Sequence, residues 1–128
     1  MRKLLWLTTA VLALATMPAL AENWIQVVQQ DGMTVSVDRD SIARNGDIAD
    51  FQSQIVWDAV QYNSLMSGGK YKWERNSEEI DCVKQTYENK SARFFDDTGA
   101  VVFSENSEGV QPIRPNSVAA LKQQTVCG

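Results

Sequence analysis

The sequence predicts an α+β fold: an antiparallel sheet of about six strands with one C-terminal helix packed on one face and tethered by a disulfide. Three observations support this prediction. Apolar and polar residues alternate with a period of two over most of residues 24–105, as they do in strands. Turn-forming residues separate the alternating segments, and residues 118–126 have the spacing of a helix. A chain of 128 residues is long enough for one such domain.

Residues 1–21 have the three parts of a cleavable export signal. Arg2 and Lys3 supply positive charge, residues 4–17 are mostly apolar, and Ala19-Leu20-Ala21 is a small-residue cleavage site. The apolar run is shorter than the about 20 residues that span a membrane, which disfavours a retained anchor. We therefore expect cleavage near Ala21, one domain over residues 22–128 and no transmembrane segment after cleavage. Because no cysteine follows the run, we expect no lipidation, and a location in the periplasm, at the cell surface or outside the cell.

The first half of the expected domain contains three alternating segments. Residues 24–30 and 34–38 are predicted to pair as a hairpin through a turn at Asp31-Gly32. Residues 38–41 end the second strand, and a further turn is predicted at residues 45–47. Alternation of apolar and polar residues returns from Phe51 onwards, and it places Phe51, Ser53, Ile55 and Trp57 on one strand face.

The second half is predicted to contain further strands and the helix. Residues 67–69 break the chain before a strand over 70–75, and residues 79–90 are predicted as one longer strand that contains Cys82. Segments 92–96 and 100–105 flank a predicted hairpin turn at residues 97–99. Either Asn116 or Ser117 is the expected N-cap of the helix, and three residues are expected on its buried face: Val118, Leu121 and Thr125.

Cys82 and Cys127 are the two cysteines of the chain. In an exported protein such a pair predicts a disulfide, which would stabilise the fold by about 4 kcal/mol in the chain-entropy model. The alternative is two free thiols, one of them a nucleophile, but the chain has no histidine to activate it.

Composition and motifs argue against several functions. Without histidine the usual general base and the commonest metal ligand are missing. Asp97-Thr98-Gly99 matches the catalytic string of aspartic proteases, but we interpret it as a turn. Asp38 and Asp40 could reach one calcium ion. The formal net charge of −4 disfavours nucleic-acid binding. We expect no enzyme activity, no cofactor and no metal site.

A relatively basic band over residues 70–93 is the candidate partner-binding surface of this acidic chain. Alternation places Lys70 and Lys72 on one strand face, and Tyr71, Trp73 and Arg75 on the other. Arginine and aromatic side chains are common interface anchors, and a basic rim steers acidic partners. We therefore predict a binding surface that includes Lys70, Lys72, Trp73 and Arg75. In the alternative interpretation Trp73 is a core residue and the lysines only solvate the sheet.

An ordered set of features resembles the surface-adhesin protein E family of Gram-negative bacteria. An export signal precedes a strand at Trp24, and the later features are Val35-Ser36-Val37-Asp38, Ser41-Ile42, Ile80-Asp81-Cys82, residues 113–117 and a terminal helix that ends at Cys127. The resemblance covers nearly the whole expected mature chain. It implies an antiparallel sheet with the helix disulfide-tied to its concave side, no enzyme activity, a homodimer, and binding to host proteins such as vitronectin, laminin and plasminogen.

Two features depart from the family pattern. No lipidation cysteine follows the apolar run, and Val110-Gln111-Pro112 lacks an expected tryptophan. The function predicted from the sequence is therefore an exported, non-enzymatic binding module. Its protein partner is a host extracellular-matrix or serum protein, or another envelope protein. The alternative is a periplasmic carrier or sensor of a small ligand held between sheet and helix, which would need a pocket of several hundred cubic ångströms.

Overall fold

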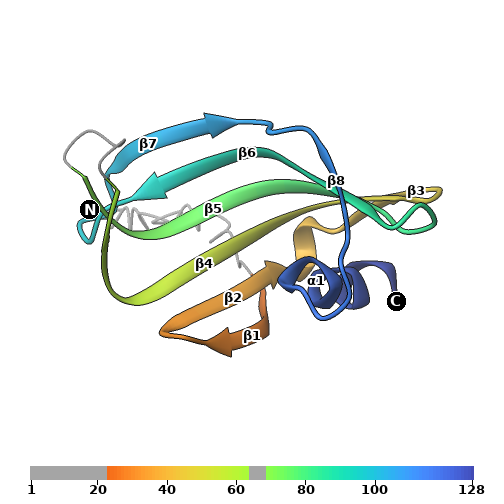
Figure 1. The fold of residues 1–128 in the computed structure, drawn as a ribbon, viewed down its shortest axis with the longest axis horizontal. Helices are drawn as coiled ribbons and strands as arrows, with labels where there is room; N and C mark the ends of the chain where they lie inside the picture. The colour runs from red at the N-terminus through yellow and green to blue at the C-terminus, as the bar shows by residue number, and fades with distance from the viewer. Residues whose placement is uncertain (1–22, 64–68) are drawn as a thin grey trace, which may run out of the picture.

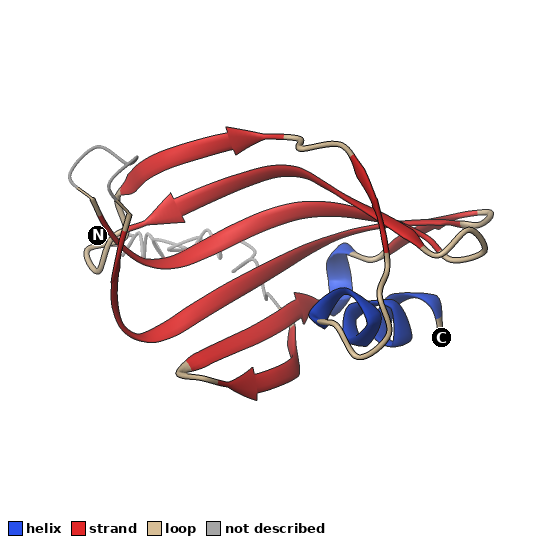
Figure 2. Cartoon of the chain, viewed as in Figure 1, coloured by secondary structure: helices blue, strands red, loops and turns tan. Residues whose placement is uncertain are grey.

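The computed structural model describes residues 23–63 and 69–128, so the predicted signal lies outside the described residues. Within them, eight strands form one antiparallel sheet in the order β1-β2-β4-β5-β6-β7, with β3 beside β4 and β8 beside β6 (Figure 1). A single-turn 3₁₀ helix, η1, follows β2, and helix α1 lies across one end of the sheet (Figure 2). The elements are β1 (Trp24–Gln30), β2 (Met33–Asp38), η1 (Arg39–Ser41), β3 (Ala43–Asn45), β4 (Ile48–Tyr62), β5 (Lys70–Asp81), β6 (Thr86–Phe95), β7 (Val101–Asn106), β8 (Val110–Pro112) and α1 (Val118–Cys127). The predicted fold class is confirmed.

The predicted hairpin turns form because their residues accept unusual backbone angles. Asp31 and Gly32 join β1 to β2 with φ of 52° and 72°, the two positive values that suit a two-residue hairpin. Gly46 lies in the β3–β4 turn and Gly99 in the β6–β7 turn, each with positive φ. These positions explain why sequence reasoning found most of the hairpins.

The strand predicted over residues 79–90 is wrong, because Cys82 lies in a turn between two strands. β5 ends at Asp81 and β6 begins at Thr86. The Asp81 carboxylate accepts hydrogen bonds from the backbone N–H groups of Val83 and Lys84, at 3.0 and 2.9 Å. Gln85 takes a φ of 55° without being glycine. The turn was missed because it contains neither glycine nor proline. It depends instead on the Asp81 carboxylate and on Gln85 in the left-handed backbone region.

One face of the sheet, which we call the helix face, carries the core beneath α1. Its buried residues alternate along β2, β4 and β5, and Val126 of α1 packs against them: Val37, Ala49, Phe51 and Ile80. The alternation predicted for residues 51–57 is borne out by the register. The most deeply buried residues of α1 are Lys122 and Val126, whereas Val118, Leu121 and Thr125, which were predicted to share one face, are half-buried.

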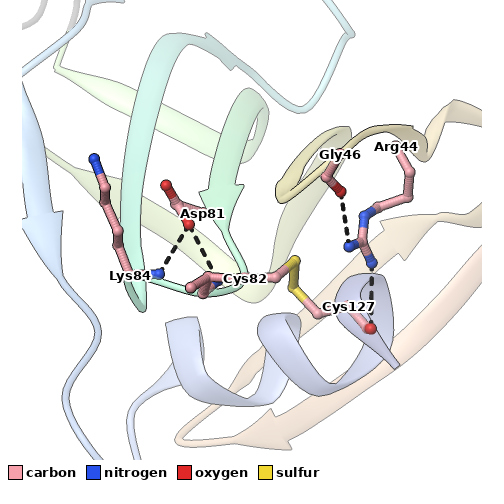
Figure 3. The surroundings of a disulfide bond; sticks show 7 residues. Arg44, Gly46, Asp81, Cys82, Lys84 and Cys127 are labelled. Atoms are coloured by element: carbon pink, nitrogen blue, oxygen red, sulfur yellow. Dashed lines mark hydrogen bonds between the residues drawn. A yellow bond between two sulfur atoms is a disulfide. The ribbon is translucent and has the colours of Figure 1, made fainter.

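Both ends of α1 are fixed. Ser117 is the N-cap, and its hydroxyl accepts a hydrogen bond from the Ala120 N–H at 3.1 Å. At the other end Cys127 forms a disulfide with Cys82, with an S–S distance of 2.06 Å (Figure 3). The Arg44 guanidinium donates a hydrogen bond to the Cys127 carbonyl at 3.2 Å and so places positive charge at the helix C-terminus. Among the described residues, no helix is long and apolar enough to cross a membrane.

Candidate functional site

The face opposite α1 carries two arginines stacked on aromatic rings. Trp73 and Phe95, paired residues of β5 and β6, lie parallel with ring centroids 3.7 Å apart. The Arg75 guanidinium lies 5.3 Å from the Trp73 ring centroid and 5.6 Å from that of Trp24. Arg93 lies 5.8 Å from the Phe95 centroid. We call this set, Trp24, Trp73, Arg75, Arg93 and Phe95, the arginine–aromatic surface.

The register holds the two arginines of this surface directly opposite each other. Like charges in that position repel. The ring contacts offset the repulsion, because a guanidinium over an aromatic face gains about 0.5–1 kcal/mol at an exposed site. Arg93 is exposed, and no ion pair of the described residues involves it. Its side chain is thus oriented by Phe95 and accessible to an anionic group of a partner.

The four residues predicted as a binding surface all lie on β5. Trp73 and Arg75 lie together, as expected, within the arginine–aromatic surface. Lys70 is exposed at the start of β5 and lies 5.9 Å from the ring centroid of Tyr62. Lys72 is half-buried. Sequence reasoning did not identify Trp24, Arg93 or Phe95, because only the pairing of β6 with β5 brings the last two beside Trp73 and Arg75.

Tyr71 lies on the helix face, so its predicted place beside Trp73 is wrong. Its ring packs edge-on against Trp57 and Phe94, with centroids 5.2 Å away in both cases. Phe94 and Phe95 are consecutive in β6, so their side chains point to opposite faces. Tyr71 packs on Phe94, whereas Trp73 stacks on Phe95. The pairing of β4 with β5 shifts register between Val56 and Gln61, next to Tyr71. Such irregularities break strict alternation.

A buried ion pair joins α1 to the helix face. Lys122 and Glu78 are each 6% exposed, and the Lys122 ammonium donates hydrogen bonds to both Glu78 oxygens at 2.8 and 3.0 Å. The Ser53 hydroxyl also donates to Glu78 and lies 3.4 Å from the ammonium. Sequence reasoning missed this group, because charged residues are rarely buried. Two features of the sequence could have revealed the pair. Glu78 lies two residues before Ile80 and so shares its strand face, and Lys122 lies one helical turn before Val126.

Glu74 lies beyond this pair on the same face. Burial raises its pKa from 4.5 to about 7; Lys122 opposes the shift, and the carboxylates of Glu78 and Glu105 add to it. Burial and the neighbouring Glu74 also raise the pKa of Tyr71. Glu74 is therefore a carboxyl group that changes charge near neutral pH.

The motifs that suggested catalysis or metal binding have structural roles. Asp97 is exposed, and it is Asp96 that accepts hydrogen bonds from the backbone N–H groups of Thr98 and Ala100, at 2.9 and 3.0 Å. Asp38 accepts from the N–H of Asp40 at 3.1 Å and so caps η1. Within the described ranges, no three acidic or cysteine side chains are placed to share a metal ion.

Two surface hollows of the described residues lie at the β5–β6 turn and beside the segment that leads into α1. Their volumes are about 230 and 280 Å³, and both lie near Tyr87, at the β8 end of the sheet. Neither is lined by a residue of α1. Between α1 and the sheet, the described side chains of Lys122 and Val126 occupy the junction.

The described residues thus form an antiparallel sheet whose terminal helix is fastened by a disulfide, with charged and aromatic side chains gathered on the face opposite the helix. The model of the surface-adhesin protein E family matches residues 24–128, and the chain belongs to this family. The resemblance inferred from the sequence is thereby confirmed.

Solved structures of protein E from Haemophilus influenzae have the same fold. Crystal form II matches with a TM-score of 0.61 and 14% identity, covering 81% of this chain and 86% of that one. The selenomethionine form matches with a TM-score of 0.63 and 15% identity, covering 81% and 84%. The chain has no match among curated proteins.

Proposed function

We propose that the mature protein is an exported, non-enzymatic binding module that attaches to a protein partner through the arginine–aromatic surface. Membership of an adhesin family over residues 24–128 carries this proposal. The surface supports it, because Trp and Arg are the residue types that most often dominate binding energy. Lys70 and Lys72 precede the surface on β5 and would steer an acidic partner toward it.

A non-enzymatic role agrees with the chemistry of the described side chains. The chain has no histidine, and the buried Glu78 is held by Lys122. Residues 1–21 are proposed to direct export, with cleavage near Ala21, and the mature chain to remain without lipid, in the periplasm or at the cell surface. Partners proposed from the family are host extracellular-matrix or serum proteins, or another envelope protein.

Two measurements test this proposal. Fractionation of cells, with mass spectrometry of the mature chain, should find the protein outside the cytoplasm and starting near Glu22. Binding to immobilised vitronectin, laminin and plasminogen should then be measured at two salt concentrations for the wild type and for a Lys70→Glu, Arg93→Glu variant. We expect the variant to lose about tenfold or more in affinity and to show a weaker dependence on salt.

The matched control reverses charge elsewhere on the surface. Lys84→Glu with Arg114→Glu changes two exposed cations of the β5–β6 turn and of the segment before α1. This control should bind like the wild type. An equal loss of affinity in the control and in the variant that carries Arg93→Glu would contradict the proposed surface. So would an unchanged affinity of the Arg93→Glu variant with its fold preserved. A cytoplasmic protein would contradict the proposed export.

A further inference from the structure

The end of the helix face that lies away from the disulfide carries aromatic rings and carboxylates together. Tyr71 lies between Trp57 and Phe94, and Phe103 of β7 follows with its centroid 6.0 Å from that of Phe94. Phe94 is buried beneath the cluster, whereas Trp57, Tyr71 and Phe103 are half-exposed. In the described part of the chain, the residues packed on this apolar cluster come from strands and none from α1.

Two carboxylates border these rings. Glu74 is paired with Phe94 across β5 and β6, and Glu105 follows Phe103 on the same face of β7. Both are half-buried. We call Trp57, Tyr71, Glu74, Phe103 and Glu105 the acidic–aromatic surface.

Negative charge exceeds positive charge at this end of the sheet. The charged and titratable groups that act on Glu74 are Glu78 and Tyr71 of β5, Glu105 of β7 and Lys122 of α1, while β4 and β6 present apolar neighbours, Ile55 and Phe94. The Lys122 ammonium is already bonded to both oxygens of Glu78. A cation supplied from outside would therefore find two carboxylates that lack an ion-pair partner among the described residues.

We propose that the acidic–aromatic surface binds a basic segment of a partner protein, whose lysine or arginine side chains lie over the rings and beside Glu74 and Glu105. Charge complementarity selects this occupant, because carboxylates attract a cation and aromatic faces add a cation–π contact to it. The arginine–aromatic surface lies on the opposite face and suits a partner of opposite charge, so this inference stands independently of the function proposed above.

The site also has a built-in dependence on pH. Glu74 gains its negative charge as pH rises through about 7, while lysine in a ligand stays protonated. The chain has no histidine that would change charge in the same range. Binding of a basic ligand should therefore strengthen between pH 5.5 and pH 8.

The test uses the mature protein and a capped decapeptide of alternating lysine and serine, with the glutamate–serine peptide as the acidic probe. Isothermal titration calorimetry at low salt should detect binding of the basic peptide alone, tighter by about tenfold at pH 8 than at pH 5.5. Glu74→Gln with Glu105→Gln should weaken this binding by about tenfold or more at pH 8 and abolish its pH dependence.

The control removes the same number of charges from exposed turns. Asp97→Asn with Glu108→Gln should leave both the affinity and its pH dependence unchanged. Equal weakening in the control would show attraction to overall charge only and would overturn the proposal. So would equal binding of the acidic peptide, no binding of the basic one, or an unchanged affinity of the Glu74, Glu105 variant with its circular dichroism preserved.

Discussion

The carboxyl group of Glu74 links the stability of the sheet to pH. Its folded pKa of about 7 lies above the ordinary value of 4.5, so between these values the folded state holds a proton that the unfolded state releases. The contribution of Glu74 to the free energy of unfolding is therefore largest below about pH 4.5. It decreases as pH rises to about 7, and above that pH it stays constant. The loss is on the order of 3 kcal/mol.

Glu74→Gln should therefore flatten the stability curve between pH 5 and 8, with the larger gain in stability at pH 8. Urea unfolding of both proteins at several pH values measures this. Glu108→Gln, an exposed change of the same kind, should leave the wild-type slope intact. A slope that survives in Glu74→Gln would mean that another group causes it.

The buried ion pair of Lys122 and Glu78 should behave as one unit. Lys122→Met leaves a buried carboxylate with Ser53 as its remaining hydrogen-bond partner among those described, which costs about 3–5 kcal/mol. Adding Glu78→Gln removes the stranded charge, so the double variant should lose less than the sum of the two single losses. Denaturant unfolding of the wild type, the two single variants and the double variant measures this coupling. If the losses in free energy of unfolding simply add, the two groups are not coupled.

At the scale of elements, the disulfide governs the last segment of the chain. Cys127→Ser should destabilise the fold by about 4 kcal/mol in the chain-entropy model, because the bridge closes a loop with a sequence separation of 45. The Cys82→Ser, Cys127→Ser double variant should lose a similar amount. Titration of the denatured, unreduced wild type should find no free thiol, and two free thiols would contradict the bridge.

The β6–β7 turn offers a matched pair of neighbouring aspartates. Asp96→Ala removes the acceptor of two backbone N–H groups and should lower the melting temperature. Asp97→Asn changes an exposed side chain and should leave both stability and binding unchanged. Differential scanning calorimetry compares the two, and a larger effect at Asp97 would restore it as a functional candidate.

Elements could be predicted where local chemistry is sufficient to specify them. The turns at Gly32 and Gly99 and the cap at Ser117 follow from residue type. β3 and β8 were not predicted, because three residues are too few to show a period of two. Trp73 and Arg75 could be placed together from alternation. Tyr71, Glu78 and Lys122 could not be placed, since a register shift and tertiary burial decide their positions.

Across the whole molecule, stability should be graded from the centre of the sheet to its edges. β4 and β5, of 15 and 12 residues, pair along most of their length and lie between other strands. β8 has three residues and pairs with β6 alone. Hydrogen exchange followed by mass spectrometry should find amides of residues 51–55 and 74–80 slowest and those of 110–111 among the fastest. Uniform protection would mean that the chain opens only by global unfolding.

The Cys82–Cys127 bridge also determines how the molecule would respond to mechanical tension. If the chain is pulled between its first strand and Gly128, force at the C-terminus passes through the sulfur atoms to the β5–β6 turn (Figure 3). Residues 83–126 form a closed loop that cannot be extended, so β6, β7, β8 and α1 are shielded from stretching. Only the segment up to Cys82 can lengthen under load, and Arg93 and Phe95 stay within the shielded loop while the bridge is intact.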